Sequence, residues 1–170
     1  MKKIPLLFLL LSPTFVFSQQ KNWAFGAKLG EPAGFNITKY LDDNKAIQLN
    51  FGTYGGFWGQ SRAHGSRPYQ NTGLAINANL LLYPEVFTSQ KIKAFYGAGL
   101  QVNSRRSYPD RLFPNYEKTI SLGANALAGL EYFPESSPIS FFVDAGFYLE
   151  VVPLPLFSHF QSGIGARFNF

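Results

Sequence analysis

The chain has 170 residues, of which 46% are hydrophobic, 17% aromatic and only 15% charged. It has no cysteine, which excludes disulfides, thiolate metal sites and thiol catalysis. The hydrophobic fraction excludes a disordered chain. The net charge is +5, and removal of Lys2 and Lys3 would leave 13 basic against 10 acidic residues, or +3. That excess is too small to indicate a nucleic-acid-binding protein. The length predicts a single domain.

The first eighteen residues are predicted to be a secretory signal peptide. A positive opening at residues 2–3 precedes the uncharged run 4–17, whose centre is almost purely leucine. Val16 and Ser18 suit the positions before a cleavage site, which we place before Gln19. A membrane-spanning helix is the alternative, but the run is shorter than the ~20 residues a bilayer requires, and it contains two prolines.

From Trp23 onward, hydrophobicity alternates with a period of two residues, as in β-strands, and no helical stripe is sustained. The last segment is the clearest: Phe160, Ile164 and Phe168 lie on one face, and Gln161 and Arg167 lie on the other. Eight segments follow this rule. They are residues 23–30, 34–38, 47–52, 74–82, 92–102, 120–132, 139–150 and 160–170.

The connections predict an up-and-down antiparallel meander, because turn-forming clusters mark every second joint. Short turns are predicted at residues 42–44, from residue 84 onward and at 134–138. Longer loops are predicted at residues 58–71, 102–117 and 153–157, with a tight joint at 31–32.

Alternation alone does not reveal which face is the core, because a membrane barrel reverses the pattern of a soluble one. The polar face is rich in glycine, which suits a narrow interior, and has too few charges for a surface in water. We therefore predict an all-β, antiparallel, up-and-down eight-stranded transmembrane β-barrel; a soluble secreted barrel is the alternative. Aromatic belts at the two membrane interfaces are predicted from Tyr40, Tyr83, Tyr132 and Phe133 at one end and Tyr54, Phe57, Trp58, Tyr108, Tyr116, Phe157 and Phe160 at the other.

On these features the chain resembles the small eight-stranded outer-membrane β-barrels of Gram-negative bacteria, over residues 19–170. The most specific feature is the terminal strand, with Phe168 and Phe170 on its apolar face. The resemblance implies export to the outer membrane, multiple membrane crossings, termini and short turns in the periplasm, and long loops outside the cell. It also implies that Phe168 and Phe170 form the signal read by the barrel assembly machinery.

An eight-stranded barrel has a lumen just wide enough to be filled by side chains. The strand parity places Lys28, Glu131, Asp144 and Arg167 inside. We predict an ion-pair cluster in which Arg167 contacts both Asp144 and Glu131. A structural network is the first interpretation, and a polar path for small solutes is the alternative.

Two pairs of residues are candidates for acyl-transfer chemistry. In the predicted hairpin between residues 139–150 and 160–170, Glu150 lies opposite His159 at the rim. His64 and Ser66 have a spacing that resembles the lipid A deacylases of the outer membrane, but they are predicted to lie in a loop. We therefore assign no catalytic residue, and a lipid A-modifying acyl hydrolase or transferase stays the alternative. The two histidines are far apart and lack acidic neighbours, so no metal or cofactor is predicted.

The predicted outer loops carry a basic patch. Because arginine matches phosphate geometry well, we expect contact with lipopolysaccharide or an acidic surface partner, and solvated loop charges are the alternative. A structural or adhesive envelope protein is therefore the preferred function, ahead of a lipid-modifying enzyme and a small-solute pathway or binder. The patch consists of Arg62, Arg67, Arg105, Arg106 and Arg111.

Overall fold

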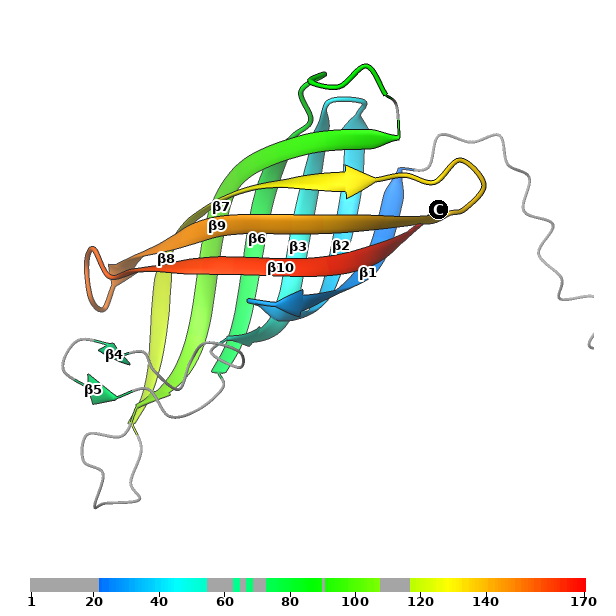
Figure 1. The fold of residues 1–170 in the computed structure, drawn as a ribbon. Coiled ribbons are helices and arrows are strands. Elements are labelled where there is room, and N and C mark those ends of the chain that lie inside the picture. Colours follow the sequence, from blue (N-terminus) through cyan, green and yellow to red (C-terminus); the bar gives the residue numbers. More distant parts are fainter. Residues whose placement is uncertain (1–21, 55–62, 65–66, 69–72, 90, 108–116) are drawn as a thin grey trace, which may run out of the picture.

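The protein is described by a computed structural model over residues 22–54, 63–64, 67–68, 73–89, 91–107 and 117–170. Within these ranges no helix is long and apolar enough to cross a membrane. Eight strands close into an antiparallel barrel in the order β1-β10-β9-β8-β7-β6-β3-β2 (Figure 1). They are β1 (Trp23–Gly30), β2 (Ala33–Asp42), β3 (Lys45–Tyr54), β6 (Gly73–Leu82), β7 (Ile92–Ser107), β8 (Glu117–Tyr132), β9 (Ile139–Val152) and β10 (Ser158–Asn169). The predicted fold class is confirmed.

The joints alternate between the two ends of the barrel. The end that carries residue 22, the C-terminus and the turns β2–β3, β6–β7 and β8–β9 is called the terminus end (Figure 1). The other, the loop end, carries the joints β1–β2, β3–β6, β7–β8 and β9–β10. The predicted meander is confirmed, although the β6–β7 joint, residues 83–91, is longer than predicted.

The outer face of the barrel is apolar and the lumen is polar. Strand β6 shows this, because its burial alternates almost without exception. Leu74 and Ile76 are 68% and 47% exposed, whereas Asn77 and Asn79 are 3% and 2% exposed. The barrel therefore exposes most of its large hydrophobic side chains on the outer face, as the sequence predicts.

Two segments predicted as loops are in part strands. Beyond Val102 the β7–β8 hairpin continues to pair, with Arg105 opposite Thr119 and Arg106 opposite Lys118. Backbone pairing does not need an apolar face, so polar residues extend both strands beyond the alternating segment. A short hairpin, β4 (Ala63–His64) and β5 (Arg67–Pro68), lies between β3 and β6, and places His64 opposite Arg67.

The predicted register of the β9–β10 hairpin is wrong by two residues. His159 lies opposite Tyr148 rather than Glu150. Leu156 adopts a left-handed φ of 69°, unusual for a residue with a side chain. This conformation turns the chain back early, so that the Glu150 N–H donates to the carbonyl of Phe157 at 2.8 Å. Every inward residue of β10 consequently meets a different partner on β9 from the one predicted.

Candidate functional site

The terminus-end part of the lumen is built around a buried ion pair between Glu131 of β8 and Arg167 of β10. Arg167 Nη1 lies 2.5 Å from Glu131 Oε2, and both side chains have no exposed surface. Tyr83 donates to the same oxygen at 2.9 Å, and Ser140 and Tyr40 donate to Glu131 Oε1 at 2.7 and 3.3 Å. Burial and the Glu131 carboxylate raise the pKa of Tyr83 well above its usual value, which keeps this hydroxyl a proton donor. Both carboxylate oxygens are thus satisfied.

Two aromatic rings contact the guanidinium of Arg167, and a glycine leaves space for the stem of its side chain. The Arg167 Cζ atom lies 4.1 Å from the ring centroid of Phe142 and 6.0 Å from that of Phe95. Arg167 Nε donates to Asn36 at 3.2 Å. Gly26 is the β1 partner of Arg167, and a Cβ atom at Gly26 would lie 2.8 Å from Arg167 Cγ. The bare backbone at this position therefore makes room for the arginine stem.

A second ion pair joins Lys28 of β1 to Asp144 of β9. Lys28 Nζ lies 2.6 Å from Asp144 Oδ1, and the side chains are 8% and 5% exposed. Asp144 faces Gly163 across the β9–β10 ladder, and a Cβ atom at Gly163 would collide with Lys28 Cε. Lys28 thus passes over a glycine to reach the carboxylate. The structure brings all four predicted charges into the lumen as two pairs, but Asp144 contacts Lys28 rather than Arg167, because of the shifted register.

Between the charged residues and the loop end, amide side chains form a hydrogen-bonded network across β3, β6, β7 and β8. Asn79 is central: it accepts from Asn125 at 2.7 Å and donates to Asn77 at 3.2 Å. Each amide offers both donors and acceptors, so a row of them can satisfy itself without net charge. The members are Gln48, Asn50, Asn77, Asn79, Gln101, Asn103, Ser121 and Asn125.

At the loop end, His159 lies inside a cage of aromatic rings. Its Nδ1 lies 2.8 Å from the Tyr54 hydroxyl, and its Nε2 lies 3.1 Å from Gln161 Nε2. The ring centroid of Tyr148 lies 5.0 Å from that of His159. Glu150, the predicted dyad partner, instead faces Gly123 of β8 and accepts from the Leu154 N–H at 3.1 Å. The cross-strand pairing on which the candidate dyad rested is therefore wrong.

Most of the large hydrophobic side chains that the strands expose lie on the outer face. Halfway along β9, Val143 is 47% exposed and Phe147 is 62% exposed. Water does not solvate such a continuous apolar surface favourably, whereas acyl chains do. The chain is a closed eight-stranded barrel with an apolar outer face, the arrangement of a transmembrane β-barrel. In such a barrel the polar side chains face the lumen, where they find their hydrogen-bond partners.

Comparison with known proteins finds a likeness in structure but none in sequence. Neither a family model nor a curated protein matches the sequence. Among solved structures, the barrel is similar to the crystal structure of Neisserial surface protein A. The TM-score is 0.47 with 19% sequence identity, over 87% of this chain and 93% of that chain.

Three aromatics predicted for the membrane-interface belts point into the lumen instead. Tyr83 and Tyr54 are only 3% and 1% exposed, and Tyr40 donates to Glu131. Their position in the alternation was the signal: Tyr40 follows Asn36 and Thr38 at a spacing of two, and therefore shares their inward face. Tyr132 and Phe160 are exposed on the outer face, as expected for belt residues. Phe57, Trp58, Tyr108 and Tyr116 lie outside the described residues.

The remaining predicted sites lie at the two ends of the barrel. Phe168 and Phe170 are 41% and 60% exposed, and their rings stack with centroids 6.3 Å apart. In the basic patch, Arg105 and Arg106 lie on strand β7 and Arg67 on β5, rather than in loops. Arg62, Arg111 and Ser66 lie outside the described residues. In the part of the chain that the structure describes, no three His, Asp or Glu side chains gather as metal ligands would.

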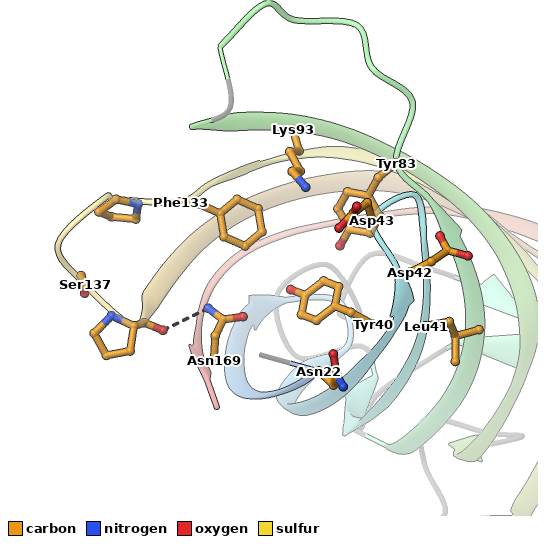
Figure 2. A pocket seen from close by; sticks show the side chains of 12 residues that line it. Asn22, Tyr40, Leu41, Asp42, Asp43, Tyr83, Lys93, Phe133, Ser137 and Asn169 are labelled. Atoms are coloured by element: carbon orange, nitrogen blue, oxygen red, sulfur yellow. Dashed lines mark hydrogen bonds between the residues drawn. The ribbon is translucent and has the colours of Figure 1, made fainter. Parts of the chain in front are cut away.

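A hollow lies at the terminus end of the barrel (Figure 2). Its volume is about 380 Å³. Tyr40 and Tyr83 form part of its wall while their hydroxyls donate to Glu131. Lys93, Phe133 and Asn169 also line it. We call this hollow the terminus-end vestibule.

Proposed function

We propose that the protein is an integral outer-membrane barrel that serves the cell envelope as a structural or adhesive surface protein, and not as an open channel. The observation that carries this proposal is the fully buried Glu131–Arg167 pair, which occupies the lumen together with Phe95 and Phe142. A water-filled pore would hydrate these two charges and leave them exposed. The exposed stacked pair Phe168 and Phe170 supports recognition by the barrel assembly machinery.

The first test asks whether the barrel forms in the outer membrane and stays closed. Protein from the outer-membrane fraction is expected to migrate faster on a gel when unboiled than when boiled, because the closed barrel resists detergent. In planar bilayers it is expected to give far less steady conductance than an open porin of the same membrane. Recovery as a detergent-free soluble monomer, or porin-like conductance, would contradict the proposal.

The β7–β8 hairpin supports a role at the surface. Val102 and Ile120 are the last outward apolar residues of its strands, at 41% and 64% exposure. Ser107 ends β7 five residues beyond Val102. Each residue of a strand adds about 3.3 Å. The five residues after Val102 therefore carry β7 beyond the apolar band, and all five are polar. Arg105 and Arg106 belong to this polar extension, which supports a contact of these residues with lipid phosphates at the membrane surface.

We expect these arginines to hold lipopolysaccharide through its phosphates. The double substitution Arg105→Glu and Arg106→Glu is expected to reduce co-purified lipopolysaccharide several-fold, measured by phosphate and fatty-acid analysis of the purified barrel. The matched control, Lys39→Glu with Lys45→Glu, reverses two exposed charges near the terminus end and is expected to leave the amount unchanged. Equal losses in both variants would count against the proposed contact.

Cells that overproduce the protein are expected to keep the acyl pattern of their lipid A, measured by mass spectrometry. A lost or added acyl chain would favour the enzymatic alternative.

A further inference from the structure

The terminus-end vestibule has the size and the wall of a small-ligand site. Its volume of about 380 Å³ lies within the range of ligand pockets. The wall combines an aromatic face, a cation and amide groups, which is the mixture that fixes the orientation of a bound molecule. The hydroxyls of Tyr40 and Tyr83 already donate to Glu131, so other groups must recognise the ligand.

Lys93 supplies the positive charge. It lies at the beginning of β7, opposite Glu131 of β8. Its side chain faces the lumen and is half-buried. Its Nζ lies 5.9 Å from the ring centroid of Phe133, and no carboxylate of the described residues forms an ion pair with it. Figure 2 shows the ammonium pointing into the vestibule. A half-buried ammonium of this kind favours an anionic group in the hollow.

Asn169 supplies an acceptor. Its amide nitrogen donates to the carbonyl of Pro138 at 3.0 Å and to Ser140 at 3.1 Å, which fixes the orientation of the side chain. The Oδ1 atom is buried and accepts no hydrogen bond from the described residues, and the side chain is only 7% exposed. Figure 2 shows this oxygen turned toward Tyr40, into the vestibule. A buried acceptor of this kind favours a donor on the ligand.

From these two groups we infer that the vestibule binds the free C-terminal end of a peptide. The terminal carboxylate would lie at Lys93, an N–H close to that carboxylate would donate to Asn169, and the terminal side chain would pack on Phe133. A simple sugar lacks the anion. Asp42 and Asp43 line another part of the wall and would repel a second negative group there. An N-acylated amino acid with one carboxylate therefore fits this wall better than a polyanion does.

The test uses the full barrel, refolded in detergent micelles, and acetyl-Ala-Ala with a free carboxylate as the probe. Binding is expected by calorimetry, with a shift of the Asn169 side-chain amide signal in NMR. Lys93→Gln and, separately, the C-terminally amidated probe are each expected to weaken binding about 10- to 100-fold, the loss of one charge-assisted hydrogen bond. Combining the two changes is expected to cost no more than either alone.

Lys91→Gln is the matched control, because Lys91 pairs with Glu135 at 3.0 Å outside the vestibule, and is expected to bind as the unmodified barrel does. The acid and amidated probes are both compared on the unmodified barrel, so this comparison can be made even if Lys93→Gln folds poorly. Equal binding of acid and amide, or no binding of the acid at millimolar concentration, would overturn the inference. Presenting the same dipeptide as the tail of a soluble carrier protein separates the two sources of the ligand: binding of both forms indicates protein tails, and binding of the free form alone indicates short peptides.

Discussion

Replacing Arg167 by methionine is expected to lower the free energy of unfolding by about 3 to 5 kcal/mol, the largest effect of any single change discussed for this protein. The substitution leaves the Glu131 carboxylate buried without its cation, although Tyr83 and Ser140 still donate to it. Urea unfolding in lipid vesicles, followed by tryptophan fluorescence, measures the loss.

A double variant separates the cost of the orphaned charge from the cost of lost packing. Arg167→Met combined with Glu131→Gln removes both charges and keeps an acceptor for the tyrosines, so it is expected to recover most of the loss. A single variant as stable as the unmodified barrel would show that the pair does not support the fold. If that stable variant also conducted ions, the result would favour the alternative that the lumen is a polar path for small solutes.

Ala145→Arg is expected to destabilise the barrel by about 2 to 4 kcal/mol, the cost of a cation near the middle of the bilayer. Ala145 lies on the outward face halfway along β9, between Val143 and Phe147. In a barrel surrounded by water the same change would fall within about 0.5 kcal/mol. The substitution therefore distinguishes lipid from water around the outer face.

Leu41→Arg is the matched control, since Leu41 is 50% exposed but lies near the end of β2 at the terminus end. A cation near the interface costs about 0 to 1 kcal/mol. Urea unfolding in the same vesicles compares the two variants. Equal costs at Ala145 and Leu41 would mean that the membrane does not surround β9 as inferred.

The fold and the contents of the lumen were predictable because they follow from local geometry. In a strand, successive side chains point to opposite faces, so the alternation around Asn77 or Arg167 assigns each residue a side without knowledge of the whole barrel. The same rule places Tyr40 and Tyr54 inside. Their closeness to strand ends is also typical of belt residues, but the alternation is the stronger indicator.

The pairing of charges was less predictable because it depends on register. The register of β9 and β10 follows from the turn between them, where Leu156 has a backbone conformation that its residue type does not reveal. A shift of two residues is enough for Asp144 to form an ion pair with Lys28 instead of Arg167. The vestibule was beyond prediction for a related reason: Lys93, Phe133 and Asn169 come together only when the start of β7, the β8–β9 turn and the end of β10 meet at one end of the barrel.

The closure of the barrel also constrains how the chain can be made. Strand β1 pairs with β10, from Ala24 opposite Asn169 to Gly30 opposite Gly163. Until synthesis reaches those final residues, the opening strand lacks one of its two neighbours and its backbone groups on that side are unmatched. A partial sheet with an unpaired edge strand is not stable in lipid, because its backbone N–H and C=O groups lack hydrogen-bond partners there. We therefore expect membrane insertion and closure of the β1–β10 seam to be coupled.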